Sequence, residues 1–171
     1  MPSSITERCG EGFIDKTGQV VLRFDSVRDF SEGLAAVEER GTWGFILPNG
    51  KFRIEPRFEA ARSFNNGLAA VKRDGRWGYI DETGKWVIDP RFKKAADFSD
   101  GLALTDAGYV DRTGVKVASP KGGTAFVQGL AHVALGDGEF GYINHRGKVV
   151  FRYRPAVVKP SMLPYSGRGE L

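Results

Sequence analysis

Residues 67–100 read GLAAVKRDGRWGYIDETGKWVIDPRFKKAADFSD, and residues 33–66 read GLAAVEERGTWGFILPNGKFRIEPRFEAARSFNN. Aligned without gaps, the two segments agree at 17 of 34 positions, where chance would give about two. Self-similarity at such a period is typical of repeat architectures, in which each unit is one supersecondary motif. The duplication therefore decides the fold class.

Turn signals divide each repeat into three short strands. In residues 67–100, Asp74-Gly75 is a hairpin signal, because both central residues of a type I′ turn need positive φ. Residues 81–84, with Asp first and Gly last, turn the chain a second time. The three expected strands are 67–71, 77–81 and 85–88.

The end of each repeat is expected to be a connection. Asp89-Pro90 should end the third strand, since proline has no N–H to donate to a neighbouring strand. Residues 91–100 carry spaced apolar side chains and should lie back across the sheet. A three-stranded unit cannot bury a core alone, so neighbouring units must stack.

Weaker copies of the pattern extend the array to five units, at about 1–32, 33–66, 67–100, 101–128 and 129–160. These units form one β-repeat domain over residues 1–160, and a tail at 161–171 without periodicity is expected to be disordered. The expected fold is all-β: a tandem array of about five three-stranded meanders, open and superhelical like a solenoid. The alternative is a closed, five-bladed, propeller-like ring sealed by residues 1–5 and the last strand.

The recurring landmarks are a Trp-Gly pair, an Ile-x-Pro-x-Phe segment and a Phe-x-x-Gly-Leu-Ala segment. They stand as Trp43-Gly44 and Trp77-Gly78, as Ile54 to Phe58 and Ile88 to Phe92, and as Phe64 to Ala69. In these landmarks the chain resembles the bacterial WG-containing repeat family. The resemblance implies a β-strand repeat array without established catalysis, usually treated as an interaction module.

Composition excludes several other classes of protein. With 41% hydrophobic and 27% charged residues, the chain is not a disordered polymer, and its single cysteine, Cys9, cannot form an intrachain disulfide. No apolar run is long enough to span a membrane, and residues 1–10 lack the apolar core of a signal peptide. We therefore expect a cytoplasmic protein without membrane insertion, or an extracytoplasmic one if the sequence is a fragment.

The charge is unevenly distributed. Residues 1–50 carry 5 Lys/Arg against 8 Asp/Glu, whereas the last 21 residues carry 4 against 1. The aromatic residues do not alternate with these cations along one strand face, so the sequence does not favour nucleic acid as a partner.

Motifs that suggest chemistry are better explained as turns. Asp15-Lys16-Thr17-Gly18 resembles the phosphorylated motif of ion pumps. Other units carry the same Asp-x-Thr-Gly pattern at the equivalent positions, residues 81–84 and 111–114, so the motif is a repeated hairpin turn. The two histidines, His132 and His145, have no metal-ligand spacing with Cys9 or with each other. We expect no catalytic, cofactor-binding or metal-binding residue, and therefore no enzyme.

The remaining conspicuous side chains are aromatic or basic. Most aromatic residues recur at equivalent positions, as packing requires, and the predicted repeat core is Trp43, Trp77, Tyr79, Phe58, Phe92, Phe64 and Phe98. Trp86 stands where other units carry Val20, Phe52, Val115 or Val149, so it is the aromatic residue expected to be partly exposed.

Binding is the function that this pattern favours. Repeats expose equivalent residues at regular intervals, and Arg57 and Arg91 follow the two repeated prolines. The sequence thus predicts a non-catalytic protein–protein interaction module with Arg57, Arg91 and Trp86 as candidate contacts. A carbohydrate- or cell-wall-binding module using Trp86 and the turn aspartates is the alternative.

Overall fold

In a computed structural model that describes residues 7–9, 12–14 and 20–155, the chain forms five small antiparallel sheets and no helix. The first sheet holds β1 (Glu7–Cys9), β2 (Gly12–Ile14) and β3 (Val20–Arg23). The second holds β4 (Ser26–Val27), β5 (Ala35–Glu39), β6 (Thr42–Ile46) and β7 (Phe52–Phe58). The third holds β8 (Ala60–Ala61), β9 (Ala69–Arg73), β10 (Arg76–Ile80) and β11 (Trp86–Phe92). The fourth holds β12 (Leu102–Thr105), β13 (Gly108–Asp111) and β14 (Lys116–Ala118). The fifth holds β15 (Gly122–Gly123), β16 (Leu130–Gly136), β17 (Glu139–Asn144) and β18 (Val149–Tyr153).

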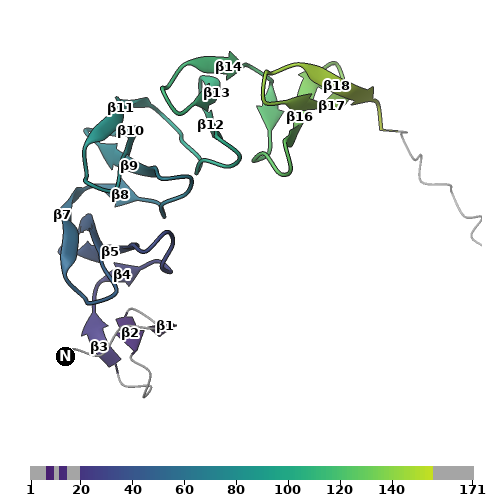
Figure 1. The fold of residues 1–171 in the computed structure, drawn as a ribbon. Coiled ribbons are helices and arrows are strands. Elements are labelled where there is room, and N and C mark those ends of the chain that lie inside the picture. Colours follow the sequence, from purple (N-terminus) through teal and green to yellow (C-terminus); the bar gives the residue numbers. More distant parts are fainter. Residues whose placement is uncertain (1–6, 10–11, 15–19, 156–171) are drawn as a thin grey trace, which may run out of the picture.

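The sheets follow one another along an open arc, with the first and fifth sheets at opposite ends (Figure 1). The predicted all-β open array is therefore confirmed. The alternative of a closed ring is wrong for the described residues, because no strand pairing joins the first sheet to the fifth. Strands β7, β11 and β14 lie along the convex side of the arc (Figure 1).

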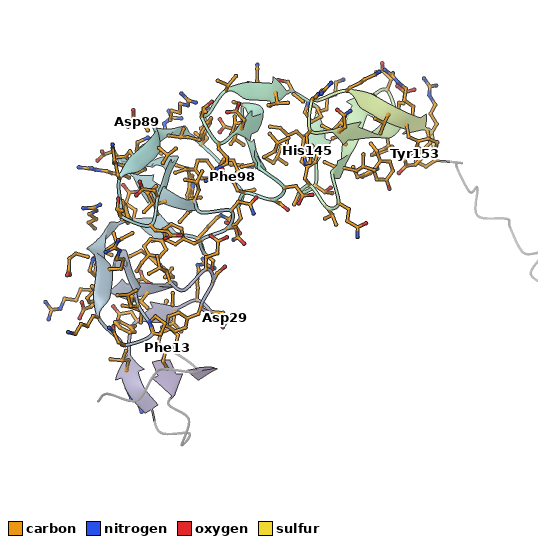
Figure 2. All side chains as sticks on the ribbon, viewed as in Figure 1. Phe13, Asp29, Asp89, Phe98, His145 and Tyr153 are labelled. Atoms are coloured by element: carbon orange, nitrogen blue, oxygen red, sulfur yellow. The ribbon has the colours of Figure 1, made fainter. Side chains whose placement is uncertain are left out.

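The hydrophobic core is divided among the four junctions between consecutive sheets. Each sheet turns one face, here called its forward face, toward the next sheet along the chain. At the second junction, Phe45 and Ile54 of the second sheet pack with Val71 and Ile80 of the third. Figure 2 shows side chains filling these spaces, with Phe98 between the third and fourth sheets. Each of the four clusters of buried residues draws on two consecutive sheets, as the stacking argument requires.

The third strand of a unit does not end at its proline. Strand β11 continues through Pro90 to Phe92, and β7 continues through Pro56 to Phe58. The expectation that Asp89-Pro90 ends the strand is wrong because both strands lie at the edge of a sheet, where one side needs no ladder hydrogen bond. The pairing with the middle strand shifts register here, since Tyr79 faces Ile88 while Trp77 faces Phe92.

This irregular third strand explains the glycine of the Trp-Gly pair. A Cβ atom added at Gly78 would lie 2.5 Å from the carbonyl oxygen of Ile88 and 2.8 Å from the nitrogen of Pro90. At Gly44 the corresponding distances to Ile54 and Pro56 are 2.6 and 2.7 Å. The backbone of the edge strand therefore approaches the middle strand so closely that only glycine fits.

The connections contribute short strands that the sequence did not reveal. Strand β8 pairs Ala60 with Lys72 and Ala61 with Val71, so the end of one predicted unit joins the sheet of the next. Strands β4 and β15 do the same in the second and fifth sheets. In residues 91–100 this contact is reduced to an isolated bridge between Ala95 and Thr105.

Two expectations fall outside the described residues: the turn at 15–18 and the tail at 161–171. Residues 1–5, which the ring alternative uses to seal the array, lie outside them as well. In the part of the chain that the structure describes, no helix is long and apolar enough to cross a membrane.

Candidate functional site

The predicted repeat core separates into buried and half-buried aromatic residues. Tyr79 and all four predicted phenylalanines have at most 4% of their surface exposed; the four are Phe58, Phe64, Phe92 and Phe98. Trp43 and Trp77 are only half-buried and pack at the margins of two core clusters. Their indole rings are covered by Arg28 and Arg62, whose guanidinium carbons lie 5.3 and 5.7 Å from the ring centroids.

Trp86 lies at the junction between the second and third sheets. Its ring meets the edge of Phe58 with the centroids 5.9 Å apart and the planes at 83°. The indole of Trp86 is half-buried, as those of Trp43 and Trp77 are, so Trp86 is not the only partly exposed tryptophan among the described residues. Its neighbour Val87 is exposed on the edge strand β11.

Arg57 and Arg91 join consecutive sheets. The Nη2 of Arg57 donates to the carbonyl oxygen of Gly84 at 2.8 Å, and Arg91 donates in the same way to Gly114 at 2.6 Å. Each guanidinium also lies over the phenylalanine that follows it in sequence, about 5 Å from the ring centroid. Both arginines are exposed, and both fasten the turn of the next unit.

The junction that contains Arg57 and Trp86 opens into a cleft of about 420 Å³. Its lining residues are Arg57, Phe58, Arg73, Gly84, Lys85 and Trp86. Three cations thus border one aromatic wall, and no carboxylate lines the cleft. The structure brings together two of the three sequence-predicted contacts here, while Arg91 belongs to the next junction.

Sequence reasoning missed Arg73 and Lys85. Arg73 ends β9 and Lys85 lies in the turn before β11, so each looks like an ordinary solvated cation in the sequence. Among the described residues, the one ion pair of these two cations is a contact of 3.8 Å between Arg73 and the exposed carboxylate of its neighbour Asp74. A comparison of the repeats at the position of Arg73 would have shown the signal, because the preceding unit carries Glu39 there.

Among the three cations of this lining, Arg73 is the one that both neighbouring repeats lack. The position of Arg73 at the end of β9 corresponds to Glu39 at the end of β5, which reverses the charge. In the fourth sheet the hairpin closes directly between Thr105 and Gly108, so the position of Arg73 does not exist. The hairpin of the third sheet therefore adds a cation to its junction that the corresponding hairpins of the second and fourth sheets do not add.

The turn aspartates are occupied by their own turns. One carboxylate oxygen of Asp81 accepts the hydroxyl of Thr83 and the N–H groups of Thr83 and Lys85, at 2.6 to 3.1 Å. The hydroxyl bond is the largest cause that lowers the pKa of Asp81. For Asp111, slight desolvation is outweighed by the matching bonds from Thr113 and Val115, so its pKa is also lowered.

The two histidines lie in aromatic packing. The ring of His145 stacks on Phe126, and the ring of His132 stacks on Phe140 at centroid distances of 5.1 and 5.6 Å. Among the described residues, no group of three or more His, Cys, Asp or Glu side chains could hold a metal ion.

The sequence matches the WG containing repeat at residues 12–43, 43–77 and 77–105. Each match begins in a middle strand (β2, β6 or β10), so the second and third matches include Gly44 and Gly78, the glycines that the edge strand approaches. The chain belongs to the WG containing repeat family. No curated protein matches the sequence significantly.

Two solved structures are similar to this WG repeat protein. One is the crystal structure of BamB from Moraxella catarrhalis, with a TM-score of 0.48 and 15% identity over 84% of this chain and 54% of that one. The WG repeat protein thus spans about half the length of that BamB. The other is a protein of unknown function from Bacteroides caccae, with a TM-score of 0.35 and 18% identity over 84% of this chain and 68% of that one.

Proposed function

We propose that this WG repeat module is a protein-interaction module that binds an acidic segment of a partner protein in the cleft between its second and third sheets. The observation that carries the proposal is the lining of that cleft: three cations, one half-buried indole and no carboxylate. An extended segment with one or two Asp or Glu side chains beside an apolar residue has the complementary chemistry.

The three cations have different roles in this proposal. Arg57 is held by Gly84 and Phe58, so its charge is fixed in place before the partner arrives. Arg73 and Lys85 are exposed and move to meet the carboxylates. Exposed ion pairs are each worth up to about 1 kcal/mol and are screened by salt. The binding should therefore weaken as the salt concentration rises.

The carbohydrate alternative receives less support from the same residues. It requires free turn carboxylates beside Trp86, whereas those of Asp81 and Asp111 already accept hydrogen bonds within their turns. Trp86 also presents its ring to Phe58, which leaves only part of the indole for stacking on a sugar. We therefore favour a protein partner.

The test is affinity capture from a nuclease-treated lysate of the source organism, with the Arg73→Glu/Lys85→Glu double variant as bait beside the wild type. We expect at least one protein to bind the wild type and to be lost with the variant. The matched control is Lys51→Glu/Lys93→Glu, which makes the same change of charge at exposed lysines outside the cleft. Equal capture by all three baits would overturn the proposal.

Variants of Arg57 and Arg91 answer a different question. Their guanidinium groups bridge consecutive sheets, so Arg57→Glu and Arg91→Glu would disturb two junctions as well as a binding surface. Each needs a parallel thermal melt, and a loss of capture counts only when the melting temperature is unchanged.

A further inference from the structure

Five sheets stacked in an open arc make four junctions, so one forward face is left over. That face belongs to the fifth sheet, and we call it the terminal face. It lies at the free end of the arc, where Tyr153 is labelled in Figure 2. Its six residues are Leu130, His132, Phe140, Tyr142, Phe151 and Tyr153.

The strand register shows that the terminal face has the pattern of a covered junction. In the third sheet Tyr79 pairs with Ala70 on one side and with Ile88 on the other. In the fifth sheet Tyr142 pairs with His132 and Phe151 at the same places. The cross-strand pair Phe140 and Tyr153 likewise replaces Trp77 and Phe92. Each position of the third forward face thus has an aromatic or aliphatic counterpart here.

The burial of the two faces is nevertheless opposite. Tyr79 and Ile88 are 0% and 2% exposed because Ala103 and Val110 of the fourth sheet pack against their cluster. Tyr142 and Phe151 are 38% and 58% exposed. No described residue covers them, and their rings contact only other residues of the same face. A contiguous aromatic face of this kind marks an interaction site.

A side chain that could accept a hydrogen bond across a junction lies without such a bond near the terminal face. Glu32, Asn66 and Asp100 stand directly before the glycine that opens a unit, and each accepts the N–H of the corresponding glycine one repeat further on, at 2.8 to 2.9 Å. All three residues have positive φ. Gln128 is the next in this series, with a φ of 50°, and its side-chain oxygen has no hydrogen bond to a described residue.

The arginine beside the terminal face likewise makes no hydrogen bond to a following unit among the described residues. Arg91 donates to the turn of the following unit, whereas Arg152, its counterpart beside Tyr153, is bonded within its own sheet to Glu139 at 3.1 Å. The terminal face therefore has the apolar pattern, the acceptor and the cation of a junction, while no described residue forms a following unit.

We propose that a second copy of this chain supplies the following unit, by docking the outer face of its first sheet on the terminal face. Each sheet from the second to the fifth packs against the forward face of the sheet before it, and no described residue packs against the outer face of the first sheet. The contact is continuous with the four junctions inside the chain. It is independent of the acidic-segment cleft of the proposed function.

Charge favours this pairing over the meeting of two identical ends. Unit 1–32 carries four Lys/Arg against six Asp/Glu, and unit 129–160 carries five Lys/Arg against two Asp/Glu. A head-to-tail contact brings opposite charges together, whereas two terminal faces would bring like charges together. Because the two surfaces differ, the contact is heterologous, and it repeats until a ring closes or a filament grows.

Sedimentation of the full chain over a wide concentration range tests the proposal. We expect the weight-average mass to rise with concentration past twice that of the monomer at low salt, and to rise less at high salt. The Tyr142→Asp/Phe151→Asp variant should stay monomeric. The matched control, Val87→Asp/Val115→Asp, places the same charges at exposed valines on other sheets and should assemble like the wild type. A wild-type mass that stays at the monomer or stops at the dimer overturns the proposal.

Mixing the chains tests the polarity of the contact. The terminal-face variant keeps its first sheet, so it can still bind the terminal face of a wild-type chain and then stop growth. Adding it in equal amount should lower the average mass of wild-type assemblies, as a chain terminator does. If two terminal faces met instead, the variant would leave the wild-type mass unchanged, and this result would also overturn the proposal.

Discussion

The forward faces of the third and fifth sheets have the same pattern in the same register, yet the first is a core and the second is a surface. Tyr79 is fully buried and donates its hydroxyl to the carbonyl oxygen of Ala96 at 2.7 Å. Tyr142, at the same register position, is more than one-third exposed. The difference lies in what covers the sheet. In a stacked array, burial is a property of the junction between units.

Truncation of the two tyrosines should separate the faces most strongly. Tyr79→Ala should lower the free energy of unfolding by about 3 to 5 kcal/mol, because it leaves a cavity inside a closed junction. Tyr142→Ala should cost less than about 1 kcal/mol, because solvent already reaches the ring. Urea denaturation followed by circular dichroism measures both. Equal losses would mean that the terminal face is covered in solution.

Substitution of the middle-strand glycine should destabilise the third and the fifth sheets to a similar extent. An added Cβ at Gly78 meets the backbone of β11, and one at Gly141 meets the carbonyl oxygen of Phe151 in β18. Both contacts lie within a sheet and do not depend on the next unit. Gly78→Ala and Gly141→Ala should each cost about 1 to 3 kcal/mol of stability. A loss confined to Gly78→Ala in thermal melts would contradict this reading.

The junction hydrogen bond offers a smaller test. Asp100→Gly removes the acceptor of the Gly129 N–H and should cost about 1 kcal/mol, partly offset by the relief of a positive φ. Gln128→Gly removes no bond to a described residue and should leave stability unchanged or slightly higher. The difference between the two variants is measured in one urea series. If they behaved alike, the acceptor in the fourth junction would contribute nothing.

The turn before the edge strand is built around Asp81 in the third sheet and around Asn144 in the fifth, and only the first should make stability depend on pH. Asp81 has a lowered pKa in the folded chain, so its contribution to stability is present above the usual pKa of 3.8 and is lost as the pH falls through the lowered value. In the fifth sheet Asn144 accepts the N–H groups of Arg146 and Lys148 without a charge. Asp81→Asn should therefore lose less stability than the wild type between neutral and acidic pH. Thermal melts at several pH values measure this difference. If the melting temperatures of the wild type and of Asp81→Asn fell equally with pH, the Asp81 hydrogen bonds would be unimportant.

The sequence predicted those residues of the site that are marked by a landmark within their own repeat, and it missed the others. Arg57 and Trp86 were found because each follows or replaces a landmark in its own repeat. Arg73 and Lys85 were missed because nothing in their own segments distinguishes them from solvated cations. Only the stacking of the second and third sheets places them around one cleft of about 420 Å³.

The prolines show the same limit. Pro56 and Pro90 indicate a missing N–H, and the sequence reading placed the end of a strand there. Whether a missing N–H matters depends on the presence of a neighbouring strand on that side, and these strands lie at the edge of their sheets. The bulged backbone at the prolines then explains the glycines at positions 44 and 78, whose requirement cannot be derived from the middle strand alone.

The sequence alone determined the repeat, its length, the three meandering strands, the turn chemistry and the family, because each of these depends on residues close together in the chain. The tertiary structure decided that the array stays open, which residues each junction buries, where the three cations meet and which aromatic face has no cover. Those features depend on contacts between residues about one repeat apart, and a repeated pattern is the same whether or not a neighbour covers it.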